Sequence, residues 1–311
     1  MSHVGEGNHK MIKHEFGGDW TEEKLSCLQK YLEAYRTIFT SNKSAKHFTN
    51  YYVDAFAGTG FRNSSNDLDQ EDTTMLFEKD EVDDIQNYFE GSVIKALEIK
   101  EPFHKYLFID NKPEYIESLK KIKEDYHNIA NRIQIVQAEA NNYLINWCNT
   151  INWKRNRAVI FLDPYGMEVD WRLIEAIGKT KAIDMWLLFP LGVAVNRMLT
   201  KNRMPQESWA NLLTRTFGTD KWKDFYIKTT QFTLWGKEQV TQKMISLKGI
   251  EDFFTNRLAQ VFPEVARKPL QLRNSKNNPL YLLCFASANR NGVKIAEDIM
   301  WKIDGRQNGC K

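Results

Sequence analysis

The sequence predicts an α/β fold in which helices cover both faces of a mostly parallel sheet. Two observations support this prediction. Short apolar stretches alternate with helical patterns along residues 49–190, and single helices separate successive strands. Two glycines, Gly58 and Gly60, directly follow the first of these strands. Strands joined through single helices form right-handed crossovers, which make neighbouring strands parallel.

The individual elements follow from local patterns. A helix is expected from Asp19 to Phe39, because acids occupy its first turn and apolar residues recur at helical spacing. Expected strands are 51–57, 106–110, 133–136, 158–163, 183–189 and 281–286, and expected helices are 92–100, 113–126, 140–148, 170–177 and 293–301.

These elements divide the chain into four parts. We expect an N-terminal helical cap over 1–48, a core over 49–190, a helical and basic insertion over 191–279, and the final strand and helix of the core over 280–311. An acidic surface insertion, 61–91, interrupts the core. Two interpretations of this insertion stay open, a mobile lid and a passive loop.

The composition is that of a globular protein. Of 311 residues, 42% are hydrophobic and 27% charged, which excludes the disordered and collagen-like classes. Apolar stretches such as 185–191 are far shorter than the ~20 residues that a membrane-spanning helix needs. The polar N-terminus has no apolar signal region. We therefore expect a cytoplasmic protein that does not contact the membrane.

The four cysteines indicate neither a metal site nor a disulfide framework. Cys27, Cys148, Cys284 and Cys310 lie far apart, without the spacing of metal ligands. We expect buried structural thiols.

Charge is distributed unevenly along the chain. Residues 1–189 carry 23 basic and 30 acidic side chains, whereas residues 190–311 carry 20 basic and 10 acidic ones. A basic C-terminal part suits a polyanionic partner, but a solvated basic surface explains the charge equally well. If a nucleic acid binds there, its phosphates are expected to contact Arg267, Lys268, Arg273 and Lys276.

The turn after the first strand predicts a cofactor. Asp54, Phe56, Gly58 and Gly60 alternate with other residues, and Asn63 occupies the position of the third glycine of a dinucleotide fingerprint. An acid within the strand suits a cofactor with an ammonium group near the turn and no phosphate there. S-adenosylmethionine (SAM) therefore fits better than NAD or FAD.

Two further acids follow the next two strands. Asp110 lies 50 residues after Gly60, and without the 31-residue insertion this spacing is 19, close to the ~20 expected for an acid that binds a ribose. Glu139, after the third strand, can accept a hydrogen bond from an adenine amino group. Each acid alone also fits a helix cap or a surface carboxylate. Together with Asp54 they predict one cofactor site, because ligands bind at the carboxyl ends of such strands.

The segment after the fourth strand predicts the chemistry. Asp163 and the Pro164 carbonyl can accept both hydrogens of an exocyclic amino group, and Tyr165 can stack on a base. These contacts would orient the nitrogen lone pair toward a methyl group without a metal, and the carboxylate would stabilise the developing positive charge. The alternative is a rigid turn with a capping aspartate.

Several motifs together resemble the three-Cys-motif partner (TcmP) family. They are Asp54–Gly60, Gly91–Leu97, Phe108–Asp110, Phe161–Gly166, the Trp20-Thr21-x-x-Lys24-Leu25 pattern followed by Tyr31-Leu32, and the strand Tyr281–Ala286. The resemblance spans most of the chain and implies a Rossmann-like class I SAM-dependent methyltransferase fold. It also implies cofactor contacts at Asp54, Gly58, Gly60, Asp110 and Glu139. In this family the three-Cys motif belongs to a partner protein, consistent with the absence of a cysteine cluster here.

Two positions depart from related patterns. Glu139 stands where Asp is commoner, and Asp163-Pro164-Tyr165 lacks the second proline of the DPPY motif of base-amino methyltransferases. It is nearer to the DPFG of a tRNA guanine-N2 methyltransferase group.

Three functional hypotheses follow. The first is a SAM-dependent methyltransferase acting on an exocyclic amino group of a nucleic acid base. The second is a catalytically idle protein that keeps the fold as a binding partner for another protein. The third, methylation of a small molecule, is disfavoured by the basic C-terminal part.

Overall fold

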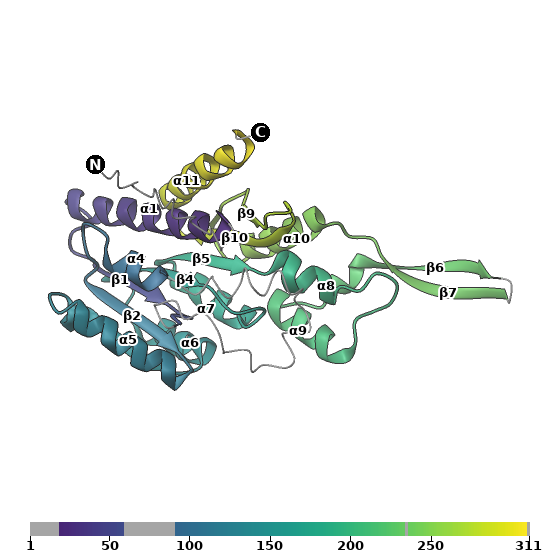
Figure 1. Ribbon diagram of the computed structural model, residues 1–311, viewed down its shortest axis with the longest axis horizontal. Coiled ribbons are helices and arrows are strands. Elements are labelled where there is room, and N and C mark those ends of the chain that lie inside the picture. The colour runs from purple at the N-terminus through teal and green to yellow at the C-terminus, as the bar shows by residue number, and fades with distance from the viewer. Residues whose placement is uncertain (1–18, 59–90, 234–235, 310–311) are drawn as a thin grey trace, which may run out of the picture.

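The computed structural model describes residues 19–58, 91–233 and 236–309. Eight strands form one sheet: β1 (Thr49–Asp54), β2 (Lys105–Asp110), β3 (Ile133–Gln137), β4 (Asn156–Leu162), β5 (Ile183–Phe189), β8 (Glu264–Val265), β9 (Leu270–Arg273) and β10 (Pro279–Ser287). Their order is β3–β2–β1–β4–β5–β10–β8, with β9 also paired to β10 (Figure 1).

The strand directions define the fold class. β1 to β5 pair in parallel, whereas β10 runs antiparallel to β5, β8 and β9. Such a sheet, with an antiparallel strand beside β5, has the Rossmann-like class I methyltransferase architecture that the sequence predicted.

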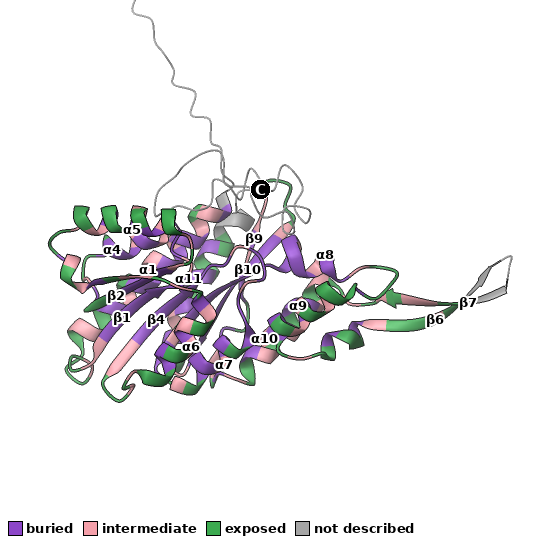
Figure 2. Cartoon of the chain, turned by 90° about the horizontal axis from the view of Figure 1, so that it is seen from below, coloured by how far each residue is buried: buried purple, intermediate pink, exposed green. Residues whose placement is uncertain are grey.

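Helices cover both faces of this sheet. They are α1 (Asp19–Ser41), α4 (Ser92–Leu97), α5 (Pro113–Asp125), α6 (Ala140–Thr150), α7 (Trp171–Thr180) and α11 (Arg290–Gly309), with a short 3₁₀ turn η1 (Ala130–Arg132) before β3. α1 packs against α4 and α11 on one face, and α6 packs against α7 on the other (Figure 2). The expected helix 92–100 ends earlier, at Leu97.

The core matches the apolar stretches of the sequence. All five residues 158–162 of β4 are fully buried, as expected of a parallel strand covered on both faces. The buried side of α1 includes Leu28 and Leu32. The predicted burial of Cys27, Cys148 and Cys284 is confirmed, while Cys310 lies outside the described residues.

The segment between β5 and β10 contains more than the helices that the sequence predicted. Its helical elements are η2 (Leu191–Val195), α8 (Asn196–Met198), α9 (Glu207–Phe217), η3 (Lys221–Phe225) and α10 (Leu247–Ala259). A two-stranded hairpin, β6 (Tyr226–Thr233) and β7 (Gly236–Lys243), projects away from the body (Figure 1). β8 and β9 join the central sheet, so core strands begin before residue 280.

Two sequence predictions fall on residues outside this description. They concern Gly60 and the acidic insertion 61–91, of which only Gly91 is described. None of the described helices is both long and apolar enough to cross a membrane.

Candidate active site

Three of the predicted acids lie at the carboxyl ends of neighbouring strands. Asp54 ends β1, Asp110 ends β2, and Asp163 directly follows β4. Because β2, β1 and β4 are adjacent and parallel, the structure brings these residues to one edge of the sheet. Open α/β sheets bind their ligands at this edge.

Lys24 reaches this edge from α1. Its Nζ atom lies 2.6 Å from Asp163 Oδ2, and its side chain is 1% exposed. Burial lowers the pKa of Lys24, and the negative charge of Asp163 opposes that change. The ion pair holds the Asp163 carboxylate in place and anchors α1 to the end of β4. Sequence reasoning noted Lys24 only as part of a family motif, because 139 residues separate the two partners.

Asp54 is the second carboxylate beside Lys24, and it is fully buried. Its pKa is raised to about 7. Burial is the largest cause, and the charge of Asp163 adds to it. Hydrogen bonding by Ser92, Tyr52 and the Phe56 N–H acts in the opposite direction.

One oxygen of Asp54 lacks a donor that meets hydrogen-bonding geometry. The Tyr52 hydroxyl donates to Oδ2 at 3.2 Å. The Oδ1 atom is buried and has no donor in hydrogen-bonding geometry among the residues that the structure describes. A buried acceptor without a donor costs ~1–3 kcal/mol. An ammonium group of a bound ligand would satisfy this atom.

Asp110 and Gly58 connect the first two strand ends. The Gly58 N–H donates to Asp110 Oδ2 at 3.0 Å, and the Lys112 N–H donates to Oδ1 at 2.9 Å. Burial raises the pKa of Asp110, and these N–H groups oppose the change. Gly58 has a φ of 58°, in the left-handed region that favours glycine. The glycine turn is therefore hydrogen-bonded to Asp110, the acid that was predicted to bind a ribose.

Glu139 is the N-cap of α6. Its carboxylate accepts hydrogen bonds from the backbone N–H groups of Asn141 and Asn142, at 2.9 and 2.8 Å. Partial burial raises the pKa of Glu139, but these hydrogen bonds outweigh it and the pKa is lowered. This is the capping role that the sequence left open, and a contact with adenine stays a prediction.

Asn141 positions the connection that follows β4. Its Nδ2 donates to the Glu168 carbonyl at 2.9 Å, and its Oδ1 accepts from the Asp170 N–H at 2.8 Å. Within this connection Gly166 has a φ of 76°, Pro164 is buried and Tyr165 is half-buried. Burial raises the pKa of the Tyr165 hydroxyl.

Glu168 is a titratable residue that sequence reasoning did not identify. Its pKa is raised to about 7. Burial is the main cause and the charge of Asp110 adds to it, whereas Lys112 and Arg215 lower the value. The sequence contains no local motif around Glu168, and only the fold brings it into the field of Asp110.

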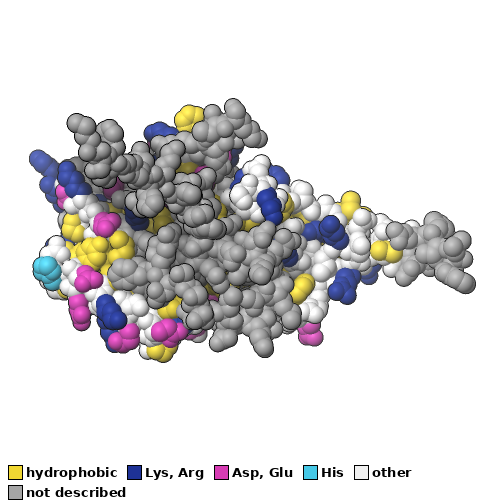
Figure 3. All heavy atoms as spheres, viewed as in Figure 1, with side chains coloured by type: hydrophobic (Ala, Val, Ile, Leu, Met, Phe, Trp, Pro, Cys, Tyr) yellow, Lys and Arg dark blue, Asp and Glu magenta, His cyan; other side chains and the backbone are white. Residues whose placement is uncertain are grey.

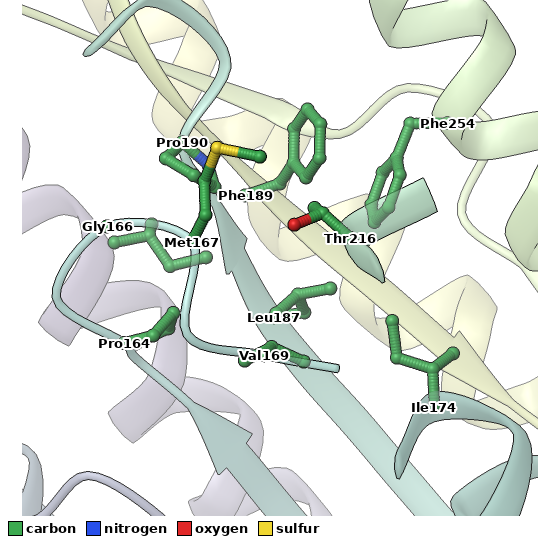
Figure 4. Close-up of a pocket in the computed structure, with 11 residues that line it drawn as sticks. Pro164, Gly166, Met167, Val169, Ile174, Leu187, Phe189, Pro190, Thr216 and Phe254 are labelled. Atoms are coloured by element: carbon green, nitrogen blue, oxygen red, sulfur yellow. The ribbon is translucent and has the colours of Figure 1, made fainter. Parts of the chain in front are cut away.

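An apolar recess lies beside this connection. Its lining combines Pro164, Gly166, Met167 and Val169 with the end of β5 and with Thr216 and Phe254, which come from α9 and α10 (Figure 4). The space inside is about 10 Å³, enough for roughly one water molecule. Ligand pockets measure ~300–1,000 Å³, so this recess is not an acceptor pocket.

The four basic residues predicted to contact phosphates do not form one patch. Arg273 ends β9, and Lys276 lies in the turn from β9 to β10. Leu282 of β10 pairs with Phe189 at the carboxyl end of β5, so this turn lies beyond that end of β5. Arg267 and Lys268 instead lie between β8 and β9, along the outer edge of the sheet. Only Arg273 and Lys276 are near the end of the sheet that carries the acids.

Comparisons with known proteins add solved structures of similar architecture. No family model and no curated protein matches the chain. A Legionella pneumophila protein is 10% identical with a TM-score of 0.45, and the match covers 92% of each chain. Spermidine synthase is 12% identical with a TM-score of 0.39, covering 89% of this chain and 64% of that one. Magnesium protoporphyrin IX methyltransferase from Synechocystis, solved with bound SAH, is 8% identical with a TM-score of 0.29, covering 78% and 90%.

These similarities are too weak to support conclusions about function. We assign the methyltransferase-like architecture from the strand order and directions.

The site fits a cationic cofactor. Lys24 carries one positive charge, and Asp54 and Asp163 together carry two negative charges when both are ionised. A bound cation would neutralise the remaining charge and supply the donor that Asp54 Oδ1 lacks. Among the described residues, no group of three His, Cys, Asp or Glu side chains is arranged to hold a metal ion.

Proposed function

We propose that the chain is a SAM-dependent methyltransferase that modifies an exocyclic amino group of a nucleic acid base. The observation that supports this most directly is the buried Asp54 carboxylate, whose Oδ1 atom has no donor beside the Lys24–Asp163 ion pair. The ammonium group of a bound SAM would offset the cost of this unpartnered acceptor.

The chain would hold the cofactor through the ends of β1 and β2. Asp54 would accept from the ammonium group, Asp110 would accept from the ribose hydroxyls, and Glu139 would lie near the adenine. The residues of the glycine turn, Gly58 and Gly60, would let the backbone approach closely. When bound, SAM supplies an electrophilic methyl group on a positively charged sulfur.

The chain would position the acceptor through the segment after β4. Asp163 would accept one amino hydrogen and the Pro164 carbonyl the other, while Tyr165 would stack on the base. The nitrogen would take the methyl group that SAM supplies, and the electron pair of the broken carbon–sulfur bond would stay on sulfur. Positive charge develops on the nitrogen until one proton leaves to water. Lys24 would orient the Asp163 carboxylate that stabilises this charge.

The motifs shared with the three-Cys-motif partner family support a further proposal. Lys24, in the N-terminal pattern, contacts Asp163, in the segment Phe161–Gly166, so two of the segments that resemble this family meet in the fold. Membership of this family would add a protein partner that carries the three-Cys motif.

The same ion pair supports a second candidate function. Lys24 lies 2.6 Å from the carboxylate that would bind the acceptor, so Asp163 would serve only to stabilise the fold in a catalytically idle binding partner. Methyl transfer distinguishes the two candidates, because only the enzyme turns over.

Two measurements test the proposed function. Calorimetric titration with SAM and with its demethylated product tests the cofactor site. Transfer of a tritiated methyl group onto mixed RNA and DNA tests catalysis in the wild type and in Asp163→Ala. Because Asp163→Ala leaves the buried Lys24 without this partner, circular dichroism should first show that the variant is folded. We expect the folded variant to bind SAM normally and to lose transfer by about 10²–10³-fold.

Asp170→Ala is the matched control. Asp170 has the same 8% exposure as Asp163 and belongs to the same connection, but it pairs with Arg172. Equal transfer by both variants would contradict the role of Asp163. SAM binding without transfer to any nucleic acid would favour the idle partner.

A further inference from the structure

We propose that the two strands of the β6–β7 hairpin, Tyr226–Thr233 and Gly236–Lys243, form a docking arm for double-stranded DNA. This proposal rests on the proposed function, because it assigns the nucleic acid whose base is methylated. The two strands pair with each other and with no other strand that the structure describes. An isolated two-stranded hairpin is at best marginally stable in water, so a partner surface would stabilise it.

The arm leaves the body on the side of the candidate active site. The chain passes from the carboxyl end of β5 through η2, α8 and α9 to the arm, which projects beyond the end of β5 (Figure 1). Asp163 lies at the same end of the neighbouring strand β4. A duplex held along the arm would therefore be close to the residues that receive the target base.

Cations without an internal counter-charge lie along the arm and its base. Lys201, Arg203 and Lys228 are exposed, and none of them forms an ion pair with a described residue. Dark blue side chains are visible between the body and the tip of the arm (Figure 3). Residues 190–245 contain nine basic and four acidic side chains. Phosphates of a nucleic acid would supply the missing negative charge.

Lys243, at the end of β7, lies beside Lys201 at the base of the arm. The Lys243 N–H donates to the Lys201 carbonyl at 2.8 Å, and the Lys243 ammonium donates to Asn196 Oδ1 at 3.0 Å. Burial and the charge of Lys201 both lower the pKa of Lys243. Like charges held close by the backbone are relieved by a bound anion.

One face of the arm carries hydrogen-bonding side chains. Lys228 is opposite Thr241, and Thr230 is opposite Gln239, so these four residues share a face. Gln239 Nε2 donates to Thr230 Oγ1 at 2.9 Å. The major groove of B-form DNA admits a two-stranded ribbon and presents base-edge donors and acceptors to such side chains. The deep, narrow major groove of A-form RNA does not, so we infer DNA.

The test compares two double variants with the same loss of charge. Lys201→Gln/Lys228→Gln removes cations from the arm region. Lys100→Gln/Lys154→Gln removes two exposed lysines that precede β2 and β4, at the opposite edge of the sheet. Fluorescence anisotropy measures binding to a labelled 30-base-pair DNA duplex, and to an RNA duplex of the same sequence, over a salt series. Calorimetry with SAM on the same proteins monitors the cofactor site separately.

We expect the arm variant to lose more than tenfold in DNA affinity at about 100 mM salt, and the slope of log affinity against log salt to decrease by nearly two. The control variant and SAM binding should remain at wild-type values. Equal DNA affinity in both variants would overturn the proposal, as would tighter binding of the RNA duplex. Wild-type protein that binds SAM but no DNA at low salt would also overturn it, while leaving the cofactor site intact. A wild-type protein that binds neither would count against the proposed function itself.

Discussion

Two aspartates at opposite ends of the parallel strands have different environments. Asp184 lies near the amino end of β5, where Oδ2 accepts from the Tyr31 hydroxyl at 2.7 Å and Oδ1 accepts from the Ser287 hydroxyl. Asp54 lies at the carboxyl end of β1, where Oδ1 has no donor among the described residues. Burial raises the pKa of both carboxyl groups.

The difference separates a structural acid from a functional one. The hydrogen bonds of Asp184 link α1 and β10 to β5, and both of its oxygens have donors within the chain. Asp54 shares the neighbourhood of Lys24 with Asp163, and its Oδ1 atom has no donor in hydrogen-bonding geometry among the described residues. We therefore expect the hydrogen bonds of Asp184 to stabilise the fold, and Asp54 to lower stability and to serve binding.

The largest expected effect concerns the ion pair beside Asp54. Lys24→Met should lower the free energy of unfolding by ~3–5 kcal/mol, because it leaves buried carboxylates without a counter-charge. Lys24→Met/Asp163→Asn should recover most of this loss. Urea denaturation measures both variants. A single variant as stable as the wild type, or a double variant no better than the single one, would show that the pair contributes little.

The second prediction tests the two aspartates directly. The pKa of Asp54 is about 7 in the folded protein and ~3.9 in an unfolded chain, so the folded state binds the proton more tightly. Its contribution to stability therefore decreases as pH rises from about 4 to 7. Asp54→Asn should equal the wild type near pH 4 and exceed it by about 4 kcal/mol above pH 7.

Asp184→Asn provides the contrast at the other end of the sheet. Its amide nitrogen replaces an acceptor that Tyr31 or Ser287 uses, which costs ~1–3 kcal/mol. This cost opposes the gain from removing a carboxylate whose pKa is raised by burial, so the net gain above pH 7 should be smaller than that of Asp54→Asn. Denaturation across pH 4–8 measures both variants. A gain in stability from Asp184→Asn as large as that from Asp54→Asn, or a loss from Asp54→Asn, would remove the distinction between the two acids.

The smallest expected effect concerns Asp110, at the carboxyl end of the neighbouring strand β2. Asp110→Ala should weaken SAM binding at least tenfold, since a hydrogen bond to a charged group contributes ~1.5–3 kcal/mol. It also leaves the Gly58 N–H without its acceptor, so circular dichroism should first show that the variant is folded. Unchanged affinity in the folded variant would remove Asp110 from the cofactor site.

Sequence reasoning predicted the parallel core well because its signals are local. A buried parallel strand such as β4 is a continuous apolar stretch, and its end places the next acid, Asp163, at the binding edge. The contact between Lys24 and Asp163 has no local signal, since it depends on how α1 packs across the sheet.

The sequence patterns did not predict the β6–β7 hairpin, and the reason is physical. Residues such as Lys228, Thr230 and Gln239 are polar and exposed, so the strands lack the apolar alternation that identifies a half-buried strand. Arg267, Lys268, Arg273 and Lys276 are close in sequence and were all predicted to contact phosphates. In the fold, the first two lie between β8 and β9, whereas the last two lie at and beyond the end of β9.

Calorimetric measurement of the affinity for SAM across pH 6 to 8 tests the assignment of Asp54 to the cofactor most directly. Wild-type protein should bind SAM more tightly as pH rises through 7, because the cation requires ionised Asp54. Asp54→Asn should bind at least tenfold more weakly and lose this dependence, whereas Asp184→Asn should behave as the wild type. SAM affinity that is the same in wild type and Asp54→Asn at every pH, or no SAM binding by the wild type, would contradict the assignment of Asp54 to the cofactor.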